Sequence, residues 1–130
     1  MDIDAPIIFW LPWPPTVNDY WKPIRGSLYL SRRGRMYKEA ACQAVAEQLP
    51  GINLDGRIMA EVTLHPPDAR VRDVDNYSKG LLDAITASAL WADDAQVDQL
   101  FVYRGETVKQ GCVRVELSPA GPIVPFDLGS

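Results

Sequence analysis

The chain has 130 residues and a mass of 14.5 kDa, which suffices for one domain and is too short for two ordinary ones. Its 47% hydrophobic and 23% charged residues exclude a disordered chain, and the lack of any apolar run near the roughly 20 residues that span a bilayer excludes a transmembrane protein. The net charge of −4 by itself argues against a nucleic-acid partner, and the single histidine argues against zinc catalysis.

The first half of the chain is predicted to form two strands and then a helix. The apolar residues 7–11 indicate a strand, and residues 12–15, Pro-Trp-Pro-Pro, end it because proline cannot donate to a β-ladder. We expect a loop over 16–27, a short strand over 28–30 and a helix over about 35–49. The residues of this helix that indicate its buried side recur at helical spacing: Tyr37, Ala41, Ala44 and Val45.

A strand and a second helix are predicted next. Apolar and polar residues alternate over 57–65, which is typical of a strand with one buried face. A polar loop over 68–74 follows this strand, and Asp75 is expected to cap a helix over about 76–89.

The last predicted elements are two strands, at 99–104 and 112–117, joined by a turn around Gly105 to Gly111. The resulting order, β-β-α-β-α-β-β, predicts an α/β or α+β fold with a small mixed sheet and two helices. Residues 1–117 are expected to form one domain, and residues 118–130, which contain prolines and glycines, a C-terminal tail.

Charge is unevenly distributed along the chain. Residues 20–40 contain six basic residues against one acidic residue, a balance of +5, and residues 68–98 contain three basic against seven acidic residues, a balance of −4. The first stretch suits phosphate groups and the second suits a cation. The overall acidity therefore conceals two regions with opposite preferences.

The stretch from Arg72 to Lys79 contains the strongest candidate for chemistry. Side chains at i and i+2 of extended backbone point the same way, so Asp73 and Asp75 are expected to present two carboxylates together. Hard divalent ions such as Mg²⁺ or Mn²⁺ prefer such oxygen donors, and Lys79 lies about one helical turn beyond Asp75, where it can hold a phosphate. The alternative is that the two acids only stabilise the start of a helix.

Two further clusters have similar alternatives. Asp93 and Asp94 follow the second predicted helix and either complete the acidic site or form a solvated turn. The basic residues near the start of the first predicted helix either grip phosphates or form a solvated helix start. These basic residues are Arg32, Arg33, Arg35 and Lys38.

These motifs together resemble the RusA family of Holliday-junction resolvases, which is common in phages and prophages. The matching blocks span about residues 7–117 in the family's order and spacing. They are Leu11-Pro12-Trp13-Pro14-Pro15 with Asn18 and Tyr20, Arg72-Asp73-Val74-Asp75-Asn76 with Lys79, and Leu82-Asp83-Ala84 followed by Trp91-Ala92-Asp93-Asp94-Ala95-Gln96-Val97.

The resemblance implies a small α/β domain that forms a homodimer and nicks four-way DNA junctions symmetrically with Mg²⁺. It implies that Asp73, Asp75 and Asp94 are the catalytic carboxylates and metal ligands and that Lys79 is a functional lysine. Asp93 and Asn76 are expected to support them, and Arg72 is expected to contact DNA with the basic residues named above. Typical members are basic, whereas this chain is acidic.

We therefore expect a metal-dependent, structure-selective DNA endonuclease that acts in recombination and repair. It is expected to be cytoplasmic, because residues 1–4 are acidic where a signal peptide would be basic and two cysteines suit a reducing compartment. Two rivals stay open: a non-catalytic junction-binding module of the same fold, and a metal-dependent phosphohydrolase of small nucleotides.

Overall fold

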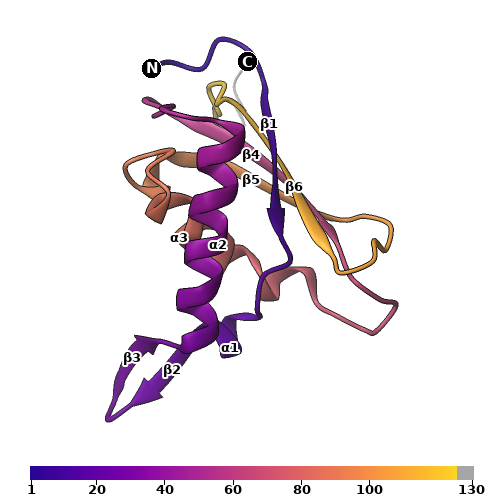
Figure 1. Ribbon diagram of the computed structural model, residues 1–130. Coiled ribbons are helices and arrows are strands. Elements are labelled where there is room, and N and C mark those ends of the chain that lie inside the picture. The colour runs from indigo at the N-terminus through magenta and orange to yellow at the C-terminus, as the bar shows by residue number, and fades with distance from the viewer. Residues whose placement is uncertain (126–130) are drawn as a thin grey trace.

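The computed structural model describes residues 1–125 and has a four-stranded mixed sheet with two longer helices on one side of it (Figure 1). A separate hairpin of β2 and β3 projects from the body next to the start of α2 (Figure 1). In chain order, the elements are β1 (Ile7–Pro12), α1 (Val17–Tyr20), β2 (Trp21–Ile24), β3 (Ser27–Leu30), α2 (Arg32–Gln48), β4 (Ile58–His65), the 3-10 helix η1 (Val74–Asn76), α3 (Ser78–Ala87), the 3-10 helix η2 (Asp94–Gln96), β5 (Val97–Arg104) and β6 (Cys112–Pro119).

The order of strands in the sheet is β1-β6-β4-β5. β6 is antiparallel to both of its neighbours, and β5 is parallel to β4 at the edge of the sheet. The predicted α+β class with a mixed sheet is confirmed. The strands β5 and β6 are consecutive in the chain but do not pair, because β4 lies between them.

The core lies between the sheet and the two helices. The predicted alternation in β4 is confirmed, because Ile58, Ala60, Val62 and Leu64 are buried while the residues between them are half-buried. These side chains meet those of α2 and α3 in one hydrophobic cluster, which includes Tyr37, Val45, Leu81 and Ile85. Burial of each of the larger aliphatic side chains is worth about 1.5–3 kcal/mol, so this cluster fixes the two helices on the sheet.

Helix α2 begins at Arg32, three residues before its predicted start. Ser31 caps it, since its Oγ accepts a hydrogen bond of 2.9 Å from the backbone N–H of Gly34. Gly34 is buried, and a Cβ at this position would lie 2.4 Å from the carbonyl oxygen of Tyr20. The glycine within the basic run therefore permits close contact between α1 and α2.

Three other predictions need correction. The predicted loop 16–27 contains α1 and β2, and β3 begins one residue before the expected strand 28–30. Helix α3 ends at Ala87, because Ala89 has a φ of +62°, which cannot continue a helix. Strand β6 continues through 118–119, so the start of the expected tail belongs to the sheet, and its last part, 126–130, lies outside the described residues. Among the described residues, no helix has the length and apolar character needed to cross a membrane.

Candidate active site

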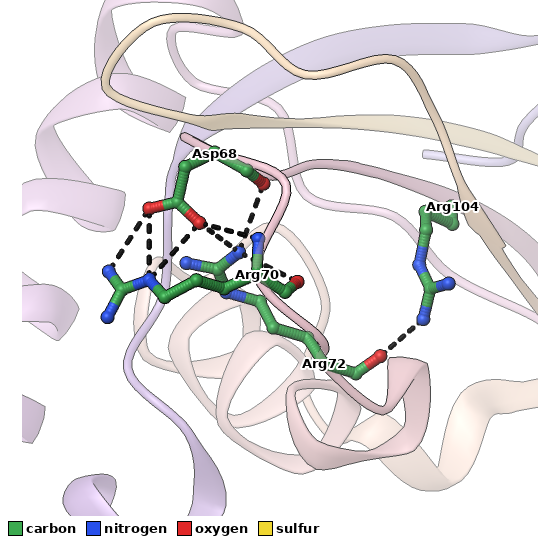
Figure 2. A network of polar contacts seen from close by, with 4 residues as sticks. All are labelled: Asp68, Arg70, Arg72 and Arg104. Atoms are coloured by element: carbon green, nitrogen blue, oxygen red, sulfur yellow. Dashed lines mark hydrogen bonds and ion pairs between the residues drawn. The ribbon is translucent and has the colours of Figure 1, made fainter.

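The connection between β4 and η1 is an irregular loop that is organised around one carboxylate (Figure 2). Asp68 accepts hydrogen bonds from the backbone N–H of Arg70 (3.0 Å), from the Arg70 guanidinium (3.1 Å) and from the Arg72 guanidinium (2.8 Å). Arg104, at the end of β5, donates to the carbonyl oxygen of Arg72. The hydrogen bonds from Arg72 and Arg70 hold the pKa of Asp68 well below its ordinary value. Together with the bond from Arg104, they fix the backbone immediately before Asp73.

Asp73 and Asp75 follow this loop, and both are exposed. Asp73 has extended backbone (φ −88°, ψ 128°), and its carbonyl oxygen accepts a hydrogen bond of 3.2 Å from the N–H of Asn76. The prediction that Asp75 caps the next helix is wrong, because Asp75 lies inside η1 and the residue before α3 is Tyr77, whose side chain forms no capping bond. Capping of α3 therefore does not account for the carboxylate of Asp75.

Lys79 lies in the first turn of α3 and is exposed. Its Nζ lies 4.9 Å from the centroid of the Trp21 ring, at the base of the β2–β3 hairpin. A cation–π contact at an exposed site is worth about 0.5–1 kcal/mol, so it orients the ammonium group without neutralising its charge. The charge therefore stays available for an anion.

Asp93 and Asp94 lie at η2. Asp93 caps this turn, accepting a hydrogen bond of 2.8 Å from the N–H of Ala95, while the side-chain oxygen of Gln96 accepts from the N–H of Ala92 at 2.9 Å. Burial raises the pKa of Asp94, and the nearby carboxylates of Asp93 and Asp83 raise it further. The chain thus turns back after α3 and places Asp94 within electrostatic reach of the helix.

Asp83 is a polar residue at this site that reasoning from the sequence did not assign. It accepts a hydrogen bond of 3.0 Å from the hydroxyl of Tyr20 and forms a 3.1 Å ion pair with the Nζ of Lys38, and these contacts link α3 to α1 and α2. Burial and the bond to Asp83 raise the pKa of Tyr20 well above its ordinary value, so the hydroxyl stays a donor. Its position one turn after Lys79 on α3 was the signal that could have identified it.

The predicted DNA-contacting residues have different environments. The ammonium of Lys38 is paired with Asp83. The guanidinium of Arg72 is paired with Asp68 and lies 5.7 Å from the Trp13 ring centroid. Arg33 forms a 3.0 Å ion pair with Asp19, and Arg35 donates to the carbonyl oxygen of Leu30 at 3.1 Å. Arg32 is exposed.

Within residues 1–125, no three Asp, Glu, His or Cys side chains are close enough together to hold one metal ion. Asp73 and Asp75 precede α3, whereas Asp94 follows it on the returning chain. The donor chemistry nevertheless suits a hard cation, because these carboxylates are exposed oxygen donors, and within the described part of the chain none of them forms an ion pair with a basic side chain.

Comparison with known proteins identifies the family of this chain. The family model described as endodeoxyribonuclease RusA matches residues 12–118. The crossover junction endodeoxyribonuclease RusA of Escherichia coli strain K12 is 32% identical over 111 residues, covering 85% of this chain and 92% of that protein. The protein of the same name from Enterobacteria phage HK97 is 34% identical over 110 residues, with the same coverage of both chains. The chain therefore belongs to the endodeoxyribonuclease RusA family.

Proposed function

We propose that this protein is a metal-dependent crossover junction endodeoxyribonuclease that resolves four-way DNA junctions by paired nicks. The observation that carries the proposal is the group of exposed carboxylates without an ion-pair partner among the described residues, on either side of α3, in a chain whose family relatives are named as junction endonucleases. A carboxylate that has no basic partner leaves its negative charge available to a cation, which favours a metal site.

The proposed metal ligands are Asp73, Asp75 and Asp94, with Mg²⁺ as the expected ion and Mn²⁺ as a substitute of the same ligand preference. When bound, such an ion activates water and offsets negative charge on the scissile phosphate. Lys79, in the first turn of α3, is the proposed partner of a phosphate oxygen, and Asp93, which caps η2, is proposed to support Asp94. The side chain of Asn76 is a further supporting candidate next to Asp75.

We further propose that the protein acts as a homodimer. A four-way junction has two symmetry-related strands to cut, and a two-fold dimer presents two equivalent sites to them. A measured mass in solution of twice 14.5 kDa supports this proposal, and a monomer that cuts both strands contradicts it.

Cleavage of three labelled substrates tests the function: a four-way junction, a linear duplex of the same sequence and a nucleoside triphosphate, each with Mg²⁺ and with EDTA. We expect symmetric nicks in the junction with Mg²⁺ only. Junction binding without nicking supports the non-catalytic module, and hydrolysis of the triphosphate alone supports the phosphohydrolase. Turnover in EDTA contradicts the metal site.

A further inference from the structure

A cleft of about 400 Å³ opens beside the loop that leads to Asp73. One wall is the proline-rich segment after β1, another is the loop around Asp68, and Arg33 at the start of α2 lies at its edge. We call it the Trp13 cleft, and its lining residues are Trp13, Pro14, Pro15, Thr16, Asp19, Arg33, Pro67, Arg70, Val71, Arg72 and Tyr77. Its volume lies within the range of about 300–1,000 Å³ that is usual for small-ligand sites.

The lining of the cleft combines an aromatic and proline wall with cationic groups. Trp13 and Tyr77 pack with their ring centroids 4.9 Å apart, beside two prolines. Three arginines and one aspartate line the same cleft, so its charge is positive in an acidic protein. An apolar, aromatic wall suits a flat base, and guanidinium groups suit a phosphate, so this combination fits a nucleotide.

Two of the three arginines can change partners at low cost. The side chains of Arg70 and Arg33 are 79% and 69% exposed, and each is held by a single exposed aspartate. Ion pairs of this kind contribute little to stability, so a phosphate can replace the aspartate. Val71, between Arg70 and Arg72, is 100% exposed and leaves an apolar side chain at the mouth of the cleft.

The walls are fixed before any ligand binds. Asp68 holds the backbone N–H of Arg70 and the guanidinium of Arg72, and Arg104 of β5 holds the carbonyl of Arg72 (Figure 2). Arg72 immediately precedes Asp73 in the chain, and one residue of extended chain spans at most about 3.6 Å. A nucleotide in the cleft is therefore the neighbour of a phosphate at the proposed carboxylates.

We propose that the Trp13 cleft receives one unpaired nucleotide next to the scissile phosphate, with its base against Trp13 and its phosphate between Arg33 and Arg70. This inference rests on the proposed junction-cutting function, since the exchange point of a junction interrupts the regular base stack. Extrusion of a base costs least where pairing is already weak, so the cleft would favour junctions with a weakened pair at that position.

The test measures the affinity of the full chain, in EDTA, for three kinds of four-way junction. One is fully paired, one carries a mismatched nucleotide and one carries an abasic nucleotide. The altered nucleotide is placed at each position of the exchange point in turn. When the mismatch lies at one particular position in each strand, we expect the junction to bind about tenfold more tightly than the paired one. The mismatched base is already unpaired, so the protein spends no free energy on breaking a base pair. The abasic junction, which is equally unpaired but offers no base, should lose this gain.

The Arg33→Ala/Arg70→Ala variant should reduce the ratio between mismatched and paired affinities to about one, whereas Arg32→Ala, which changes the residue next to Arg33 but lies outside the cleft, should keep the ratio. Both substituted positions are exposed, so an unchanged circular dichroism melt confirms folding. Three results would overturn the proposed role of the cleft. They are a ratio of one for the wild type, an equal gain in affinity for mismatched and abasic junctions, and a ratio that is unchanged in the double variant. Metal-dependent nicking of the paired junction in the same preparations shows separately that the proposed function stands.

Discussion

Asp68 and Asp73 lie in the same connection between β4 and α3, yet their carboxylates have opposite environments. Asp68 accepts hydrogen bonds from two arginines, which it uses to shape the loop, whereas Asp73 is exposed and forms no ion pair within residues 1–125. Other aspartates differ in the same way. Asp19, Asp83 and Asp98 each form an ion pair with a basic side chain. Asp75, Asp93 and Asp94 form none with the described residues.

This difference separates aspartates that have a basic partner in the fold from aspartates that have none among the described residues. A basic partner favours the charged form of a carboxylate, whereas a carboxylate without such a partner leaves its charge available to a cation. The second group matches the carboxylates proposed as metal ligands, with Asp93 beside them as the cap of η2. The comparison predicts that neutralising a paired acid and an unpaired acid will have different consequences.

The largest expected effect is on catalysis. Asp75→Asn should reduce junction nicking at least about 100-fold while junction binding is kept, because it removes a charged metal ligand at an exposed position without a change in size. The measurement is single-turnover cleavage of a labelled four-way junction with Mg²⁺, alongside a gel-shift titration.

The matched control is Asp98→Asn, which neutralises an aspartate on β5 that is paired with Arg57. It should nick at close to the wild-type rate. Equal losses of nicking in the two variants would show that the division between paired and unpaired acids does not identify the active site.

The next effect concerns the basic residues. Replacement of Arg32, Arg33 and Arg35 by Ala should weaken junction binding by about 10–100-fold at moderate salt and flatten the dependence of log K on log salt by up to about 0.9 per arginine. Affinities measured at several salt concentrations for the wild type and the triple variant give both slopes. Coincident slopes would show that these arginines are a solvated helix start, and phosphate contacts would then have to be sought near Arg70, Arg72 and Arg104.

The sequence predicted those features of the fold and of the candidate site that depend on a local pattern of residues. The alternation of β4 and the apolar stripe of α3 follow from periodicity, and the spacing of Asp73, Asp75 and Lys79 identified the acidic stretch. The strand order could not be read in the same way, because β4 pairs with strands some 40 to 60 residues away and packing decides which of them become its neighbours.

Two local features were missed for identifiable reasons. Residues 16–27 were expected to form a loop, but β2 pairs with β3 in a hairpin outside the main sheet, and its turn uses the positive φ of Arg25 (50°) and Gly26 (80°). The role of Asp83 depends on Tyr20 and Lys38, which approach it only after α1, α2 and α3 have packed. The spacing of Asp83 from Lys79 could indicate that the two share a helix face, but it could not identify Tyr20 and Lys38 as the partners of Asp83.

A smaller effect is expected on stability at neutral pH. Asp94→Asn should raise the Tm by about 2 °C, because it removes a charge that lies near the carboxylates of Asp93 and Asp83. The pKa of Asp94 is raised in the folded chain, so the folded state holds this proton more tightly than the unfolded state. Its unfavourable contribution therefore grows as pH rises above the ordinary pKa of an aspartate, about 3.9. Differential scanning calorimetry without metal measures the shift, and a fall in Tm would mean that the charge has a stabilising partner.

The smallest effect is the opposite dependence on pH at Asp68. The guanidinium groups of Arg72 and Arg70 lower the pKa of Asp68 below its unfolded value of about 3.9, so its stabilisation is present above that pH and is lost as pH falls toward the folded-state pKa. Asp68→Asn should thus lower the Tm by about 1–2 °C at pH 7, and the difference in Tm should shrink as pH falls below about 3.9, where the unfolded carboxyl becomes protonated. Tm values of both proteins between pH 2 and pH 7 check this. A Tm difference between the two proteins that stays constant from pH 2 to pH 7 would show that the charge of Asp68 plays no part in its effect. A higher Tm for Asp68→Asn than for the wild type, as expected for Asp94→Asn, would remove the distinction between paired and unpaired acids on which the site assignment depends.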